Sequence, residues 1–213
     1  MVIQPYCMKS PLFRITFVAL LLLTASCKKK TARDYYDSAN AKYYAEDKSG
    51  ALEDVSKAVE LQPKFLNAYV LKAKVELALY QFGAAKLDCQ KAISLDPEGE
   101  EACYILAETA KETGDHRGEI NAYSMIIAIE PDSAINYSTR ATLRQKAGDL
   151  KGALQDFNKC IQLKPKDGSF YYWRGMVKVD ANDTDGACED FHKAKAMGDI
   201  SADAAISLNC GGV

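Results

Sequence analysis

The spacing of its prolines is the feature that most restricts how this chain can fold. Four of its six prolines stand 34 residues apart, at Pro63, Pro97, Pro131 and Pro165. They close four similar segments, "GALEDVSKAVELQP", "AAKLDCQKAISLDP", "GEINAYSMIIAIEP" and "GALQDFNKCIQLKP". A fifth copy, "GACEDFHKAKAMGD", follows at the same interval without a proline. Apolar residues in these segments have helical spacing, and proline ends a helix because it cannot continue one. We therefore expect one helical unit repeated five times.

The segment before each of these helices repeats in the same register, which predicts a second helix in every unit. When each unit is numbered from its first residue, beginning with residue 32, the eighth place is always small. The residues at that place are Ala39, Ala73, Ala107, Ala141 and Gly175. Small residues let two helices approach closely, and larger neighbours fill the gaps beside them. One such pair cannot bury its apolar face alone, so the units are expected to stack.

This 34-residue pattern resembles the tetratricopeptide repeat (TPR) over residues 32–199. The resemblance implies an all-α fold, an α-solenoid that winds as a right-handed superhelix of five helix-turn-helix units. Their boundaries would be 32–65, 66–99, 100–133, 134–167 and 168–199. Residues 200–213 would form a capping helix and tail, with Ile200, Ala204, Ile206 and Leu208 covering the exposed face of the last repeat.

One residue departs from the pattern in the third unit. Glu119 stands at the twentieth place, where the other units have Ala51, Ala85, Ala153 and Ala187. A carboxylate is too large and too polar for a close helix contact. We therefore expect the third repeat to be locally distorted, with Glu119 reaching outward.

The N-terminus reads as an export signal. Lys9 and Arg14 precede the short apolar run "ITFVALLLLTA", which is typical of a signal peptide over residues 1–26. "LTASC" resembles the lipobox of bacterial lipoproteins, although Thr24 stands where that family usually has leucine. The resemblance implies acylation of Cys27 and anchoring of an exported protein to the inner or outer membrane of the cell envelope.

The residues next to this signal leave two questions open. Residues 27–31 would form the lipidated cysteine and a basic tether, whose three lysines favour anionic headgroups. The alternative is a soluble secreted protein that is cut near the same point. Met8 makes a cleaner start than Met1 for the signal peptide, so residues 1–7 are a possible over-extension of the reading frame.

The sequence gives little support for catalysis or for cofactor binding. The net charge of −2 lacks the basic field of a nucleic-acid binder. His116 and His192 have no partners at metal-ligand spacing, and no phosphate loop or nucleophile elbow is present. "DANDTDGACEDFH" resembles a calcium loop but lacks ligands at its first and twelfth places. We expect no enzyme activity, cofactor or metal.

Five cysteines follow Cys27, and three of them occupy core positions as small apolar residues. An exported protein meets an oxidising compartment. Cys188 lies on the last repeat helix and Cys210 ends the capping segment, so a disulfide between them is a hypothesis. Cys89 with Cys103 is a weaker candidate pair.

The TPR resemblance also implies a concave groove, lined by the first helix of each unit, that binds a protein or peptide. Groove places carry tyrosines suited to peptide recognition. An acidic ridge is expected where three glutamates share one helix face. The candidate residues are Tyr36, Asn40, Tyr43, Tyr44, Lys74, Glu101, Tyr104, Glu108, Glu112 and Tyr172.

These features together predict a membrane-anchored scaffold for protein–protein interaction in a cell-envelope complex. The alternative is an accessory subunit that recruits or regulates an enzyme or a polysaccharide-handling system in the envelope. A solvated charged face is the simpler interpretation of the glutamate ridge.

Overall fold

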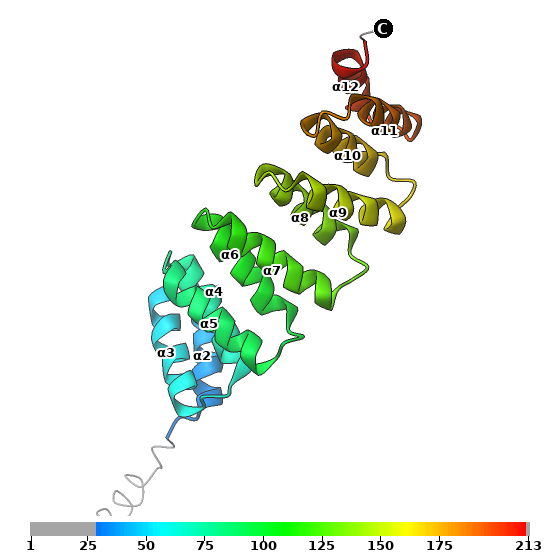
Figure 1. Cartoon of the computed structure of the whole chain (residues 1–213). Helices are drawn as coiled ribbons and strands as arrows, with labels where there is room; N and C mark the ends of the chain where they lie inside the picture. Colours follow the sequence, from blue (N-terminus) through cyan, green and yellow to red (C-terminus); the bar gives the residue numbers. More distant parts are fainter. Residues whose placement is uncertain (1–28, 212–213) are drawn as a thin grey trace, which may run out of the picture.

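The chain is a stack of paired helices in a computed structural model, which describes residues 29–211 (Figure 1). That range contains eleven α-helices and no β-strand, which confirms the all-α solenoid. The first helices of the pairs, called A helices, are α2 (Ala32–Tyr44), α4 (Leu66–Ala78), α6 (Glu100–Glu112), α8 (Ala134–Lys146) and α10 (Gly168–Asp180). The second, called B helices, are α3 (Lys48–Leu61), α5 (Phe82–Leu95), α7 (His116–Ile129), α9 (Leu150–Leu163) and α11 (Thr184–Ala196). The helix α12 (Ala202–Asn209) follows.

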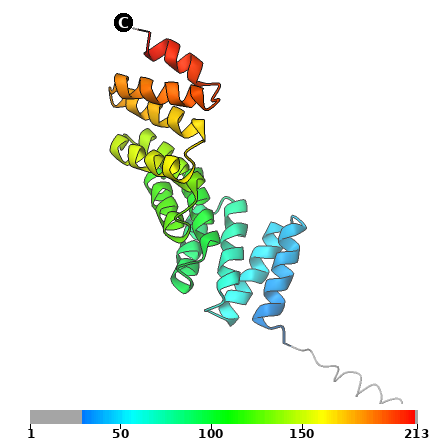
Figure 2. The ribbon, with the colours of Figure 1, turned by 90° about the vertical axis from the view of Figure 1, so that its right-hand side faces the viewer.

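The pairs succeed one another along an elongated, curved array with α2 and α12 at opposite ends (Figures 1 and 2). The predicted signal peptide and Cys27 lie outside the described residues. Within residues 29–211, no helix combines the length and the apolar character needed to cross a bilayer.

The turn between the A and B helices is built by an aspartate and a glycine three residues apart. In the third repeat, Asp115 accepts a hydrogen bond from the backbone N–H of Gly118 at 2.9 Å and so caps α7. A Cβ on Gly118 would lie 2.5 Å from the Asp115 carboxylate, so the turn requires glycine there. Asp149 with Gly152 repeats this contact in the fourth repeat.

The small residues at the helix contacts are fully buried, as the repeat pattern predicts. Ala39 and Ala51 have no exposed surface, and Val55 packs with them in the first core cluster. At the eighth place of the fifth repeat, a Cβ on Gly175 would lie 2.6 Å from the ring of Phe191. The large Phe191 ring therefore uses the space that alanine occupies in the other repeats.

The prediction that Glu119 distorts the third repeat and reaches outward is wrong. Helix α7 is regular over His116–Ile129 and has the same aspartate cap as α3, α9 and α11, so the third repeat is not distorted around this residue. Glu119 is 7% exposed and does not reach outward into solvent. It lines a cleft instead, which gives the carboxylate room that a close helix contact would have denied.

The capping helix α12 packs on α11, but with a different face from the predicted one. Ala202 and Ala205 are buried and Ile206 packs beside them, whereas Ile200 and Leu208 are 91% and 83% exposed. Ala204 is also exposed. The helix begins at Ala202, and its inner face therefore follows the spacing 202, 205 and 206. A disulfide joins Cys188 to Cys210 across this contact, with a Cα–Cα distance of 5.7 Å.

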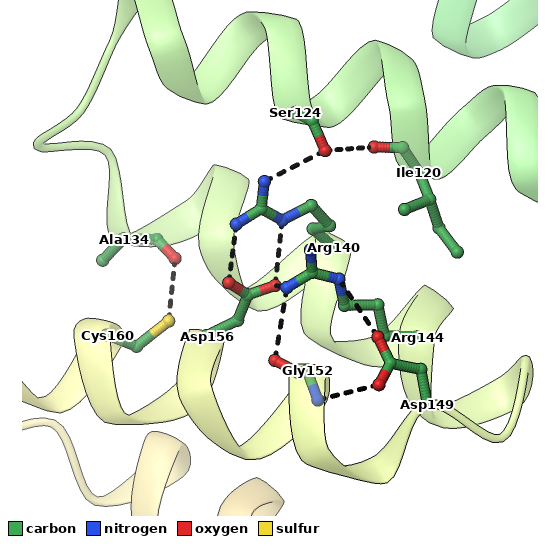
Figure 3. Close-up of polar contacts among 9 residues, drawn as sticks. All are labelled: Ile120, Ser124, Ala134, Arg140, Arg144, Asp149, Gly152, Asp156 and Cys160. Carbon is green, nitrogen blue, oxygen red and sulfur yellow. Dashed lines mark hydrogen bonds and ion pairs between the residues drawn. The ribbon is translucent and has the colours of Figure 1, made fainter.

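Buried acid–base clusters, which the sequence analysis did not identify, join the A and B helices of four repeats. An aspartate at the twenty-third place pairs with basic residues at the seventh or eleventh place of the A helix. In the fourth repeat Asp156 pairs with Arg140 and Arg144 (Figure 3). The third repeat has Leu106, Ala110 and Ala122 at the three places instead. The recurring aspartate column was the sequence signal for these clusters.

The cluster of the second repeat contains two acids and only one base. Glu76 stands where the first, fourth and fifth repeats have a base, and it shares Lys72 with Asp88. Glu76 Oε1 lies 2.9 Å from Lys72 Nζ, while Oε2 has no hydrogen-bond partner among the described residues. Burial, together with the nearby Asp88, raises the pKa of Glu76 to about 7.

Replacing Glu76 by lysine is expected to stabilise the protein by about 1–3 kcal/mol at pH 8 and by less at pH 5. The folded state holds the Glu76 proton more tightly than the unfolded state. Its contribution to stability is therefore present below the unfolded pKa and is lost as the pH rises through about 7. Urea denaturation at both pH values measures the effect, with the exposed Glu60→Lys as the matched charge control. A gain of equal size at both pH values would contradict this account.

Candidate functional site: a cleft on the A helices

A cleft of about 1180 Å³ runs along the A helices from α4 to α10, and we call it the A-helix cleft. Its A-helix lining is Lys74, Leu77, Glu100, Glu101, Tyr104, Ile105, Ala107, Glu108, Lys111, Ser138, Thr139, Thr142, Leu143, Lys146, Ser169, Phe170 and Trp173. Three B-helix residues, Glu119, Tyr123 and Phe157, complete it. The cleft therefore spans the third, fourth and fifth repeats and reaches the second.

Several predicted groove residues meet at the second and third repeats. Lys74, Glu101, Tyr104 and Glu108 line the A-helix cleft. A smaller hollow of about 350 Å³ adjoins it and shares Lys74 and Glu101 with it. Tyr36, Asn40 and Tyr44 line that smaller hollow. The two hollows thus connect the predicted residues of the first three repeats along one side of the stack.

Three predicted groove residues lie outside both hollows. Tyr43 packs on the first core cluster with its ring 5.5 Å from that of Tyr44. The ring of Tyr172 packs 5.9 Å from Phe191, toward the core of the last repeat. Glu112 is exposed in the last turn of α6. A binding role for these three residues stays a prediction.

The predicted acidic ridge is largely neutralised by neighbouring lysines. Glu101 forms an ion pair with Lys74 of the preceding A helix. Glu108 pairs with Lys111 on its own helix at 3.1 Å. Both pairs are solvent-exposed and contribute little to stability, so a charged ligand can exchange them at small cost. They define the polar rim of the cleft and do not form a continuous acidic surface.

Two exposed aromatic side chains line the A-helix cleft, one on α6 and one on α10. Tyr104 is 38% exposed, and its hydroxyl group lies 3.1 Å from Glu130 Oε2 and 3.2 Å from Asn136 Oδ1 as donor. Trp173, the only tryptophan of the chain, is 45% exposed on α10. Large exposed aromatics beside a hollow are common at protein interfaces. Trp173 was missed because it stands at the sixth place of its repeat, outside the places the resemblance assigns to the groove.

The described residues show no group of three or more His, Cys, Asp or Glu side chains that could hold a metal ion. The free thiols Cys89 and Cys160 are buried away from the cleft, and burial raises the pKa of each to about 12. Thiols with such pKa values are poor nucleophiles near neutral pH.

A stack of helix pairs with an open cleft on its A helices defines the class of protein as an α-solenoid suited to binding other proteins. The tetratricopeptide repeat family matches residues 66–98 and 134–167, which are the second and fourth units. Two of the five units therefore match the tetratricopeptide repeat family.

Solved structures of low sequence identity share this fold. The crystal structure of MamA protein is 22% identical, with a TM-score of 0.65 over 81% of this chain and 94% of that one. YrrB, described as "a TPR protein with an unusual peptide-binding site", is 18% identical, with a TM-score of 0.67 over 90% and 97% of the two chains. MamA from Desulfovibrio magneticus RS-1 is 15% identical, with a TM-score of 0.61 over 79% and 96%.

Two curated relatives are similar over part of their length. The UDP-N-acetylglucosamine–peptide N-acetylglucosaminyltransferase of Giardia intestinalis (strain ATCC 50803 / WB clone C6) is 31% identical over 104 residues, 42% of this chain. Sperm-associated antigen 1 of Rattus norvegicus is 30% identical over 84 residues, 39% of this chain. The aligned segments cover 7% and 9% of those proteins, less than a tenth of either. This similarity therefore extends to repeats and not to a catalytic domain.

Proposed function

We propose that this protein is a membrane-anchored scaffold that holds a peptide segment of a partner protein in the A-helix cleft. The observation that carries the proposal is the cleft itself, whose volume and aromatic lining suit an unfolded segment of several residues. The peptide-binding site named for YrrB is supporting evidence by likeness of fold. The cleft has no arranged catalytic group among its described residues, so a binding role fits it better than an enzymatic one.

The location that we propose is the cell envelope. The signal peptide over residues 1–26 and the lipobox-like cysteine Cys27 support an exported, lipid-anchored protein. Acyl chains on Cys27 would hold the protein firmly, because two or more chains bind a bilayer stably where one does not. The first described helix begins at Ala32, only five residues after Cys27, so the first repeat would lie close to the membrane surface.

Photo-crosslinking in intact cells tests the proposal. A benzophenone amino acid in place of Trp173 is expected to capture a discrete partner, and Trp173→Ala is expected to weaken binding of that partner about 10-fold. The matched control carries the same probe at Leu87, a 67% exposed apolar residue of α5 outside the cleft. The crosslinked product is expected in the membrane fraction. Equal capture at both positions would contradict the cleft assignment, and a product confined to the soluble fraction would contradict the anchor.

A further inference from the structure

Glu119 is a largely buried residue in the wall of the A-helix cleft, and its carboxylate has no partner within the described part of the chain. It is 7% exposed and lines the cleft from α7. Across residues 29–211, no hydrogen bond or ion pair joins the Glu119 carboxylate to another group. The buried carboxylates of Asp54, Asp156 and Asp190 are all paired with lysine or arginine. Glu119 is therefore an exception to the way this chain treats buried acids.

Among the described residues, the charged groups that face Glu119 form no ion pair or hydrogen bond with its carboxylate. Lys111 and Glu108 approach it from α6, but they pair with each other at 3.1 Å. His116 lies on its own helix and Lys146 on α8, and both are exposed to solvent and attract Glu119 only through space. Burial dominates this balance and raises the pKa of the Glu119 carboxyl.

The surroundings of Glu119 suit a long cationic side chain. Tyr123 stands one helical turn further along α7 and lines the same cleft, as do Tyr104 and Phe157. Lysine and arginine bury their aliphatic stems against such apolar walls and bring the charge to a carboxylate. A cation at this point would pair with a carboxylate that folding has already partly desolvated, so part of the cost of burying the acid has been met. A metal ion fits less well, because no cluster of three ligating side chains is present in the described part of the chain.

We infer that the A-helix cleft selects a peptide with a lysine or arginine side chain, which enters beside Tyr123 and pairs with Glu119. This inference rests on the proposed function and specifies its ligand. The partner segment would carry the basic residue between apolar residues, since the flanking walls of the cleft contain Leu77, Ile105, Leu143 and Phe170. Glu119 is a specificity-determining residue in this account, and the exposed pairs at the rim are secondary.

Oriented peptide libraries test the inference with the full chain as bait. Each library is a degenerate nonapeptide pool with one fixed central residue, and binding is compared among fixed Lys, Arg, Gln, norleucine and Glu. We expect the pools with Lys or Arg to bind about 10-fold more tightly than the pool with Gln at pH 7.5. Glu119→Gln is expected to abolish that preference and to keep the weaker binding of apolar pools. Glu60→Gln, at an exposed acid of α3 outside the cleft, is the matched control and is expected to keep the preference.

The pH dependence of the preference for Lys and Arg distinguishes a charged contact with Glu119 from a purely structural role of this residue. Burial raises the pKa of Glu119 above the ordinary range of a glutamate, so lowering the pH from 7.5 to 4 is expected to neutralise its carboxylate. The preference for Lys and Arg is therefore expected to fall over that change in the wild type and in the control variant, and to be absent at both pH values in Glu119→Gln. Binding of other pools without a preference for bases would overturn the inference and leave the proposed function standing. A preference that survives Glu119→Gln would also overturn it. Failure of every pool to bind would overturn both the inference and the proposed peptide-binding function.

Discussion

Replacing Asp156 by alanine is expected to lower the free energy of unfolding by about 3–5 kcal/mol, because it removes the acid from a buried ion-pair cluster. The side chain of Asp156 is 4% exposed. Its Oδ1 accepts from Arg140 Nη2 at 2.7 Å, and its Oδ2 accepts from Arg140 Nε at 2.9 Å and from Arg144 Nη1 at 2.8 Å (Figure 3). Without the carboxylate, two largely buried guanidinium groups would lose their counter-charge. Urea denaturation followed by circular dichroism measures the loss.

The chain itself offers the control for this substitution. The third repeat has an apolar set, Leu106, Ala110 and Ala122, at the places of Arg140, Arg144 and Asp156. A triple variant that copies this set into the fourth repeat removes the whole cluster and leaves no unpaired charge. It is expected to unfold within about 1 kcal/mol of the wild type, since buried ion pairs replaced by apolar groups often cost little. A triple variant no more stable than Asp156→Ala would contradict the explanation.

The same cluster also supports the geometry of the cleft. Arg140 Nη1 donates to Ser124 Oγ at 3.0 Å, and Ser124 lies on α7 of the preceding repeat (Figure 3). The cluster therefore connects the third repeat to the fourth. Glu119 and Tyr123 lie at this junction, where they face the residues of α8. Loss of Asp156 is expected to loosen that junction in addition to destabilising the fourth repeat.

Loss of the disulfide is expected to release the C-terminal helix. Cys188 and Cys210 are 22 residues apart, and closing a loop of that size is worth about 3 kcal/mol by the chain-entropy estimate. Helix α12 has only eight residues, and besides the disulfide it contacts α11 through two buried alanines, the partly buried Ile206 and an exposed ion pair of Lys195 with Asp203. In Cys188→Ser/Cys210→Ser, the amide hydrogens of α12 are expected to exchange about 100-fold faster, while those of α8 keep their rate.

Hydrogen exchange with and without a reducing agent provides the control for this prediction. The reduced wild type should match the double variant, because the other described cysteines are buried free thiols that a reductant does not change. Exchange in α12 that is indifferent to reduction would contradict a stabilising disulfide. Mass mapping under non-reducing conditions would report the pairing directly.

The repeat architecture could be predicted from the sequence because its causes are local and periodic. A proline ends each of four B helices, glycine follows the capping aspartate in four turns, and small residues occupy the close contacts. These constraints act within one unit of 34 residues and need no knowledge of distant contacts. The same reasoning predicted that Cys188 lies near Cys210, since a short capping segment folds back on the helix before it.

The tertiary structure alone decided which residues the cleft contains and what Glu119 does. The sequence placed Glu119 at a close helix contact and predicted that it reaches outward, but the helices of the third and fourth repeats leave a hollow that receives it. Trp173 joins this cleft and Tyr172 turns to the core, although the two are neighbours in sequence. The repeat pattern specifies contacts within one helix pair, whereas the shape of a cleft depends on the angles between successive pairs. Those angles result from many small packing contacts between repeats, and the sequence of one repeat does not specify them.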